Sequence, residues 1–456
     1  MHENYDLDLL LELAQSKQYR RLKELLSDMN EVDIAEFLDE VEPEQLIVIF
    51  RLLPKSLAAD VFTYLEDSED QEKLIGALSD QELRGMLNEL YLDDAVDIIE
   101  DMPANVVSRI LRNTDTETRN QINQLINYPK DSAGSIMTTE FVYLHPDATV
   151  EESFARIRQV GLDKETVYTC YVTRRRKLEG VVTVRRMLLS PYETRIGDIM
   201  ETNVLSVNTH DDKEDVAQMF SKYDLTALPV VDGDMRLVGI VTVDDAMDVL
   251  EEETTEDMEK MAAILPTDKP YLKTGAVETW RARLPWLLLL MLSATFTGVI
   301  LTGFESALAA CVVLTSFIPM LTGTGGNSGS QSSVAVIRAL SLGEVTFADT
   351  LSVMWKEVRV GVLCGVCLGA ANFVKMLLVD RWLLSNPEVT VMVALVVCLT
   401  LAATVVCAKL VGCLLPIVAD KVGIDPAVMA SPFITTVVDA LSLLIYFGIA
   451  VNLLKL

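Results

Sequence analysis

Five long apolar segments follow Arg283, and they constrain the fold more than any other feature of the sequence. The segments cover about 284–302, 307–340, 360–379, 389–415 and 430–454. Each is near or above the roughly 20 residues that a helix needs to cross a bilayer. We therefore expect residues 281–456 to form an all-α transmembrane domain of five helices, with the lipid bilayer as its surroundings.

The charged residues are spread unevenly along the chain. Its formal net charge is -29, from 38 Lys and Arg against 67 Asp and Glu, although 50% of its residues are hydrophobic. From Tyr271 onward about 11 basic and 10 acidic residues nearly cancel, which leaves about -30 on the preceding part. An acidic soluble part is thus joined to a nearly neutral apolar part. This balance argues against a nucleic-acid partner and favours a cation.

The N-terminal residues indicate on which side of the membrane the acidic part lies. Met1 to Leu13 mixes acids with leucines and lacks the basic stretch and apolar core of a cleaved signal peptide. Basic residues beside the apolar segments favour the same side by about six to three. We expect a multi-pass protein of the plasma membrane with a cytoplasmic N-terminus.

The second apolar segment is interrupted by small and polar residues. Pro319 is followed by Gly325 and Gly326, which allow close backbone approach, and by Asn327 and Gln331, which supply neutral oxygens and amides. Irregular polar stretches at membrane depth are tolerated where protein or a water-filled path surrounds them. Two interpretations remain open: these residues line an ion path, or they form a small-residue face for helix packing.

The fifth apolar segment contains Asp439, the only acid that we expect well inside a span. A charge at that depth costs at least ~2.5 kcal/mol, so it indicates a functional site. Thr435 lies four residues earlier on the same helix face, and Thr436 follows it. If two subunits met at a two-fold axis, two copies of Asp439 would face each other across a pore and would repel unless they held a cation.

The stretch from about Ser135 to Leu250 repeats itself. Ser135-Ile-Met-Thr recurs as Asp198-Ile-Met-Glu-Thr, and Gly180-Val-Val-Thr recurs as Gly239-Ile-Val-Thr. Each copy reads as a strand, a helix, two alternating strands and a second helix. We expect two α/β domains over 131–192 and 193–250, and the second copy closely resembles a CBS domain. CBS pairs often bind adenine nucleotides, which makes ATP a candidate ligand, although the first copy carries Arg174-Arg175-Arg176 where the second has Asp232-Gly-Asp.

The remaining acidic regions are expected to be helical. Residues 1–130 contain short amphipathic units separated by prolines, which predicts an all-α superhelical stack, and 251–280 predicts a connecting helix. Most of the acids form a solvated face. Three groups are denser: Asp93, Asp94 and Asp97; Asp244, Asp245 and Asp248; and 251–253 with Glu256, Asp257 and Glu259. Two carboxylates ~4 Å apart repel by about 4 kcal/mol, so such clusters favour a hard cation such as Mg²⁺ or Ca²⁺.

Taken together, the helical acidic domain, the CBS pair, the connecting or plug helix and the two membrane motifs resemble the MgtE family of magnesium channels over nearly the whole chain. The resemblance implies a homodimer with a pore on its axis, in which Asp439 coordinates a largely hydrated Mg²⁺. It also implies regulatory Mg²⁺ sites. The residues that match them are Asp93, Asp97, Glu214, Asp224, Asp245, Asp248, Glu253, Glu256, Asp257 and Asp425.

The function expected from these observations is Mg²⁺ import through a channel that cytosolic Mg²⁺ closes. No GxxxxGK[ST] loop occurs, and we expect no enzymatic activity. The competing hypothesis is a membrane-anchored CBS sensor of nucleotide or divalent cation that transports nothing. Asp439 distinguishes the two, because an anchor has no use for a buried carboxylate.

Overall fold

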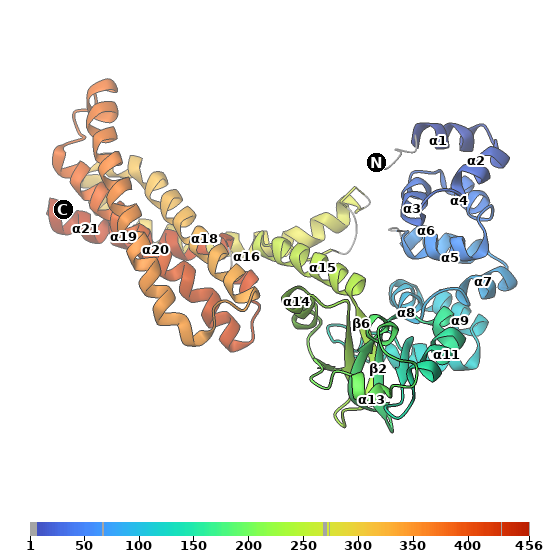
Figure 1. Cartoon of the computed structure of the whole chain (residues 1–456). Coiled ribbons are helices and arrows are strands. Elements are labelled where there is room, and N and C mark those ends of the chain that lie inside the picture. Colours follow the sequence, from blue (N-terminus) through green and yellow to red (C-terminus); the bar gives the residue numbers. More distant parts are fainter. Residues whose placement is uncertain (1–6, 66–67, 268–270, 273, 430, 456) are drawn as a thin grey trace. The chain divides into compact units, whose positions relative to one another are not determined.

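The computed structural model describes the whole chain except residues 1–6, 66–67, 268–270, 273, 430 and 456 (Figure 1). It divides into two compact units. The first unit is Met1–Glu252 with Lys269–Lys273, and the second is Glu253–Asp268 with Thr274–Leu456.

The first unit begins with short helices, labelled from α1 in Figure 1. Their starts follow local capping chemistry: Asn30 caps α3, and Ser79 with Glu82 forms a capping box on α7. Leu22, Ile34 and Phe62 are fully buried between them. The helices are α1 (Leu7–Gln15), α2 (Tyr19–Leu26), α3 (Glu31–Asp39), α4 (Pro43–Phe50), α5 (Lys55–Thr63), α6 (Ser68–Ala77), α7 (Asp80–Leu87), α8 (Leu92–Asp101), α9 (Ala104–Asn113) and α10 (Thr116–Leu125).

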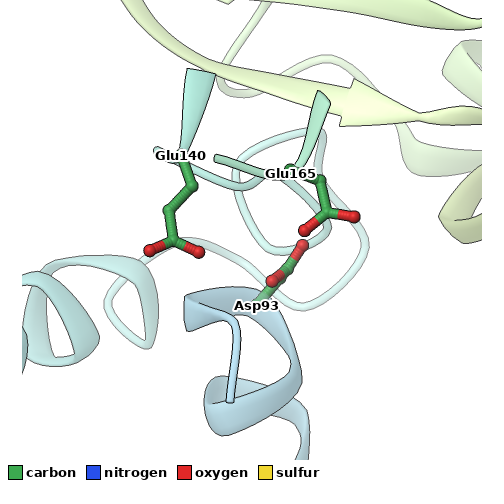
Figure 2. Close-up of side chains that lie close together, drawn as sticks. All are labelled: Asp93, Glu140 and Glu165. Carbon is green, nitrogen blue, oxygen red and sulfur yellow. The ribbon is translucent and has the colours of Figure 1, made fainter. Parts of the chain in front are cut away.

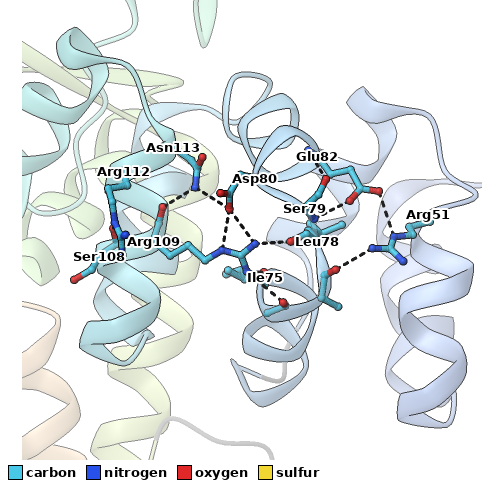
Figure 3. Close-up of polar contacts among 12 residues, drawn as sticks. Arg51, Ile75, Leu78, Ser79, Asp80, Glu82, Ser108, Arg109, Arg112 and Asn113 are labelled. Carbon is cyan, nitrogen blue, oxygen red and sulfur yellow. Dashed lines mark hydrogen bonds and ion pairs between the residues drawn. The ribbon is translucent and has the colours of Figure 1, made fainter.

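Arg109 on α9 ties together the turn between α6 and α7 (Figure 3). Its guanidinium donates hydrogen bonds to the carbonyl oxygens of Ile75 and Leu78 and lies 3.2 Å from Asp80 Oδ1. Because Asp80 opens α7, one side chain of α9 fixes both the end of α6 and the start of α7. The helical stack is therefore held by polar contacts between successive units as well as by its apolar core.

Two small α/β domains complete the first unit, as the sequence predicts. Each has a three-stranded sheet, ordered β1-β2-β3 and β4-β5-β6, whose first pair is parallel and whose second pair is an antiparallel hairpin. The elements are β1 (Phe141–Leu144), α11 (Val150–Val160), η1 (Gly161–Asp163), β2 (Thr166–Arg174), β3 (Lys177–Thr183), α12 (Val184–Leu188), α13 (Ile196–Ile199), β4 (Val207–Asn208), α14 (Lys213–Tyr223), β5 (Ala227–Val231), β6 (Leu237–Thr242) and α15 (Val243–Met261).

The repeated glycines Gly180 and Gly239 have equivalent roles in the two copies. Next to Gly180, Val181 exchanges backbone hydrogen bonds with Glu201, and next to Gly239, Ile240 exchanges them with Thr138. A Cβ on Gly180 would lie 2.8 Å from the Glu201 carbonyl oxygen, and one on Gly239 would lie 2.7 Å from that of Thr138. Only glycine allows this approach. The repeated motif therefore pairs the last strand of each domain, β3 or β6, with the segment that precedes the first strand of the other domain.

The connecting segment is shorter than the helix expected over 251–280. Helix α15 begins at Val243, inside the second α/β domain, and ends at Met261. The boundary expected near 250 therefore falls within one continuous helix.

The second unit is helical. Its helices are α16 (Ala276–Gly303), α17 (Glu305–Ala310), η2 (Val312–Phe317), α18 (Ile318–Ser341), η3 (Phe347–Asp349), α19 (Thr350–Lys375), the π-helix η4 (Met376–Leu383), α20 (Val391–Val422), η5 (Pro426–Met429) and α21 (Ser431–Leu454). Among the described residues, four spans are long and apolar enough to cross a membrane: Ala276–Gly303, Phe347–Leu383, Val391–Val422 and Pro426–Leu454. The segment expected over 307–340 is instead divided into α17, η2 and α18, and the polar residues of α18 lower its hydropathy.

Glycines on α18 allow α20 and α21 to pack closely against it. A Cβ on Gly325 would lie 2.7 Å from Thr404 Cγ2, and one on Gly329 would lie 2.8 Å from Ile434 Cγ2. On α20, a Cβ on Gly412 would overlap the carbonyl oxygen of Gly329. These contacts make α18, α20 and α21 a tight three-helix core.

Candidate cation sites

Three carboxylates come together in the first unit (Figure 2). Asp93 in the first turn of α8, Glu140 and Glu165 each offer an oxygen, and these oxygens lie within 4.8 Å of one another. Asp93 Oδ1 and Glu165 Oε2 are buried and have no hydrogen-bond partner among the described residues. Glu140 Oε2 accepts a hydrogen bond of 3.2 Å from the backbone N–H of Leu92. Carboxylate oxygens at this spacing are suitable ligands for Mg²⁺ or Ca²⁺.

Strand pairing explains why Glu140 and Glu165 are neighbours. They directly precede β1 and β2, which are parallel with Phe141 opposite Thr166, and the Glu165 N–H donates to the Glu140 carbonyl oxygen at 3.0 Å. Neither residue was predicted from the sequence as a site residue. The signal that could have identified them is an acid immediately before each of two parallel strands.

Burial and mutual repulsion raise the pKa values of these carboxyl groups. Burial first, and then Asp245, raise the pKa of Asp93 well above its usual range. Burial and the charge of Asp244 raise the pKa of Glu165 to about 7. For Asp94, burial and Asp245 raise the pKa to about 6. The ionised forms are thus disfavoured until a cation neutralises them.

The acids of α8 and of the start of α15 form one electrostatic cluster. Burial raises the pKa of Asp245 to about 6, even though Thr242 donates a hydrogen bond of 2.5 Å to it. The surrounding protein and then the charge of Asp245 raise the pKa of Asp97 to about 7, although the residue is exposed at the surface of the single chain. The structure therefore brings together Asp93, Asp97 and Asp245. For Asp248, burial and acids of α15 itself raise the pKa.

Glu214 and Asp224 do not meet within one chain. Glu214 lies in the first turn of α14 and accepts a hydrogen bond of 3.1 Å from Gln218. Asp224 follows the last turn, with a positive φ of 52°. Asp224 lies ten positions after Glu214, which corresponds to about 15 Å along the helix axis. They cannot ligate the same ion within this chain.

A second acidic group lies in the second unit, around Lys260 at the end of α15. Lys260 Nζ lies 2.6 Å from Glu256 Oε1 and 2.6 Å from Asp425 Oδ2. Burial and then Asp425 raise the pKa of Asp257, against the opposing effect of Lys260. The structure thus gathers Glu256, Asp257 and Asp425, with Glu253 one turn earlier on the helix. Lys260, which the sequence analysis did not single out, is the cation among them.

The expected pore residues separate into two sets. Asn327 and Gln331 lie four residues apart on an exposed face of α18, whereas Gly325 and Gly326 are buried. A Cβ on Gly326 would lie 2.9 Å from Thr435 Cγ2, so the packing interpretation holds for both glycines within this chain. Pro319 is exposed in the first turn of α18.

On α21, Asp439 is partly buried. Its Oδ1 is enclosed and has no hydrogen-bond partner among the described residues. Thr435 lies one turn before it on the same helix, and the Thr436 hydroxyl donates to the Pro432 carbonyl oxygen at 3.1 Å. A carboxylate oxygen without a hydrogen-bond partner inside an apolar helix is suited to act as a ligand of a cation.

The expectation that Asp439 is the only acid well inside a span is wrong. Helix α19 begins at Thr350, so Glu357 also lies within a span, and it faces Lys409 of α20 at 3.8 Å. The third apolar segment expected from the sequence, 360–379, begins after this acid. Lys409 itself is visible in the sequence as a lone base inside the fourth segment.

A cavity of about 910 Å³ lies beside the two α/β domains in the first unit. Its lining includes Lys164, Arg175, Arg176 and Arg236 together with Tyr143. Arg175 and Arg176 form the turn between β2 and β3, and both have positive φ values, 54° and 67°. The cavity is a basic surface in an otherwise acidic unit.

Comparison with known proteins gives a class that agrees with this organisation. Residues 318–449 match a family described as a divalent cation transporter, residues 29–131 match an intracellular N domain of the same family, and residues 133–191 and 196–252 match the CBS domain. The three matches together define the class of the chain, a divalent cation transporter with an intracellular N domain and two CBS domains.

The chain is similar over its full length to proteins named magnesium transporter MgtE. It is 38% identical to the protein of Thermus thermophilus, over 98% of both chains, and 32% identical to that of Bacillus subtilis, over 93% of this chain and 95% of the relative. A solved structure, the cytosolic domain of the Mg²⁺ channel MgtE in complex with ATP, matches 53% of this chain with 37% identity and a TM-score of 0.50. This chain belongs to the MgtE family.

Proposed function

We propose that this protein carries Mg²⁺ across the plasma membrane, with its N-terminal part in the cytoplasm. The observation that carries the proposal is Asp439, whose enclosed Oδ1 has no hydrogen-bond partner among the described residues of a membrane-spanning helix. Full-length similarity to proteins named magnesium transporters supports the same conclusion and favours transport over an anchored sensor.

A homodimer is the proposed assembly, and the polar face of α18 supports it. Asn327 and Gln331 are exposed in the single chain, on a helix that packs against the apolar helices α20 and α21. Polar groups in a membrane need a protein or water partner. A second copy across a shared axis would enclose this face, with both copies of Asp439 beside a common path for hydrated Mg²⁺.

The test of transport is Mg²⁺ uptake into liposomes that contain the full-length protein. Asp439→Asn should lower the flux at least tenfold, whereas Glu344→Gln, which changes an exposed acid between α18 and α19, should leave it near wild type. Wild-type flux in Asp439→Asn would remove the pore assignment. Equal uptake of Co²⁺, Ni²⁺, Mn²⁺ or Ca²⁺ would remove Mg²⁺ selectivity.

The acidic clusters are proposed to close the channel when cytosolic Mg²⁺ is high. The carboxylates of Asp93, Glu140 and Glu165 suit a hard cation, because two of their buried oxygens lack partners. The same proposed control by Mg²⁺ includes further acids of both units. They are Asp97, Glu214, Asp224, Asp245 and Asp248 in the first unit, and Glu253, Glu256, Asp257 and Asp425 in the second unit. When Mg²⁺ falls, these carboxylates repel one another, and the closed arrangement loses the ion that favoured it.

ATP is proposed as a second ligand of the CBS pair. The ATP complex of the related cytosolic domain supports it, and the basic cavity with Lys164, Arg175 and Arg176 offers counter-charges for a triphosphate. Calorimetric ATP titration should show weaker binding in Arg175→Ser/Arg176→Ser than in the control Arg185→Ser/Arg186→Ser, whose residues lie on α12 outside that lining. Loss in the control pair alone would move the site to α12.

A further inference from the structure

A buried polar chain links three helices of the membrane unit. Lys409 Nζ of α20 donates a hydrogen bond of 3.3 Å to Ser332 Oγ of α18, and this hydroxyl donates one of 2.5 Å to Glu357 Oε2 of α19. Lys409 Nζ also lies 3.8 Å from Glu357 Oε2. The side chains of Lys409 and Glu357 are only 6% and 12% exposed. Opposite charges are thus joined through one hydroxyl, away from solvent.

The helices approach each other closely at this place. A Cβ on Gly361, one turn after Glu357, would lie 3.1 Å from Val406 Cα and 3.5 Å from Lys409 Cδ. Gly412, three residues after Lys409 on α20, contacts the backbone of Gly329 and so brings α18 and α20 together. Charged groups inside membrane helices are costly and are usually tied to function.

The polar chain does not belong to the ion path. Ser332 is buried, whereas Asn327 and Gln331 lie on the exposed face of α18. The Lys409 ammonium already neutralises Glu357, so this acid is not available to a divalent cation. The three linked side chains therefore act on the ion path only through α18, the helix that carries both Ser332 and the exposed polar face.

We propose that Ser332, Glu357 and Lys409 are positioning residues that fix the rotation of α18 about its own axis. Ser332 directly follows Gln331, and successive residues of an α-helix are turned by about 100°. Holding Ser332 against α19 and α20 leaves one orientation for Gln331 and for Asn327, one turn earlier. The inference rests on the proposed function, because it assigns the orientation of the polar face that would select the ion.

Ser332→Ala is the direct test, since it removes both hydrogen bonds and leaves the two charges in place. Its matched control is Ser328→Ala, one turn earlier on the same buried face, whose Oγ has no hydrogen-bond partner among the described residues. In liposomes with equal inward gradients, Ser332→Ala should lower the ratio of Mg²⁺ to Ca²⁺ flux roughly threefold or more, and Ser328→Ala should keep the wild-type ratio. An unchanged ratio in Ser332→Ala would overturn the proposal.

A charge-neutral pair separates positioning from simple charge balance. Lys409→Met alone should reduce the yield of folded protein, because it leaves Glu357 buried and unpaired. Lys409→Met/Glu357→Met should restore the yield but not the flux ratio. A wild-type flux ratio in the double variant would show that only the overall neutrality of the site matters, and would refute the positioning role. These outcomes are distinct from a failure of the proposed function, in which the wild-type protein itself would carry no Mg²⁺.

Discussion

Lys260 Nζ lies 2.6 Å from Asp425 Oδ2, so the end of α15 is tied to the segment before α21 by an ion pair within one unit. Burial lowers the pKa of Lys260, but hydrogen bonds with Asp425 and Glu256 outweigh burial and raise it above its ordinary value. The ammonium thus occupies the place in which the proposed regulatory Mg²⁺ would compete with it.

Removing this ammonium should make the second unit more sensitive to Mg²⁺. In Lys260→Met, Glu256, Asp257 and Asp425 lose their internal counter-charge. A gain of about 1 kcal/mol for Mg²⁺ binding corresponds to a roughly fivefold lower Mg²⁺ concentration for half-closure. This half-closing concentration is measured as the Mg²⁺ flux across liposome membranes at graded Mg²⁺ on the cytoplasmic side. The control is Lys356→Met, on the exposed face of α19. A higher half-closing concentration would mean that Lys260 assists closure instead.

The raised pKa values of the first unit predict a pH-dependent need for Mg²⁺. The pKa of Glu165 is about 7 against an ordinary 4.5, and that of Asp245 is about 6 against 3.8, so the folded unit holds protons that the unfolded chain releases. Without Mg²⁺, stability should therefore fall as pH rises from about 4 to 7. Thermal unfolding should show little stabilisation by Mg²⁺ at pH 5 and a large one at pH 7.5. Equal stabilisation at both values would contradict the cluster as a cation site.

Neutralising one carboxylate of the Asp93, Glu140 and Glu165 group should have opposite effects with and without the ion. Glu165→Gln removes a repelling charge, so the free energy of unfolding without Mg²⁺ should rise by about 1 kcal/mol, after allowance for solvent screening. The stabilisation by saturating Mg²⁺ should fall by at least half. Glu193→Gln, an exposed acid between α12 and α13, is the control for both measurements. An unchanged Mg²⁺ effect would remove Glu165 from the ligand set.

The contact between α18 and α20 predicts the effect of one added methyl group. In Gly412→Ala the new Cβ would overlap the Gly329 carbonyl oxygen, so α20 must move away from α18. We expect the free energy of unfolding to fall by about 2 kcal/mol or more, which would lower the midpoint of thermal unfolding in detergent. Gly448→Ala on α21 has no atom within 4 Å of the added Cβ and should be neutral or slightly stabilising. Equal midpoints for both variants would contradict the close packing.

Local sequence patterns predicted the parts of this structure that depend on neighbouring residues. Apolar runs located the four spans found among the described residues, the repeat around Gly180 and Gly239 located two α/β domains, and short amphipathic units separated by prolines predicted the helical stack. Contacts between distant residues were beyond such patterns. Glu140 and Glu165 are 25 positions apart and meet only because β1 and β2 are parallel. Lys409 and Glu357 meet only after three helices have packed. Asp439 was predicted from its depth in an apolar segment and Asp245 from a dense group of acids, and the resemblance to a family then implied a pore role for the first and a regulatory role for the second.

The polarity of α18 has a consequence for how the protein is made. This helix is not among the four described segments that are apolar enough to cross a membrane, yet it packs against both α20 and α21. A helix of this kind gains little from lipid and enters a bilayer by pairing with other helices. During synthesis, however, α18 leaves the ribosome before α20 and α21 exist. We therefore predict that its insertion waits for later parts of the same chain, so that truncation after α19 leaves α18 outside the membrane.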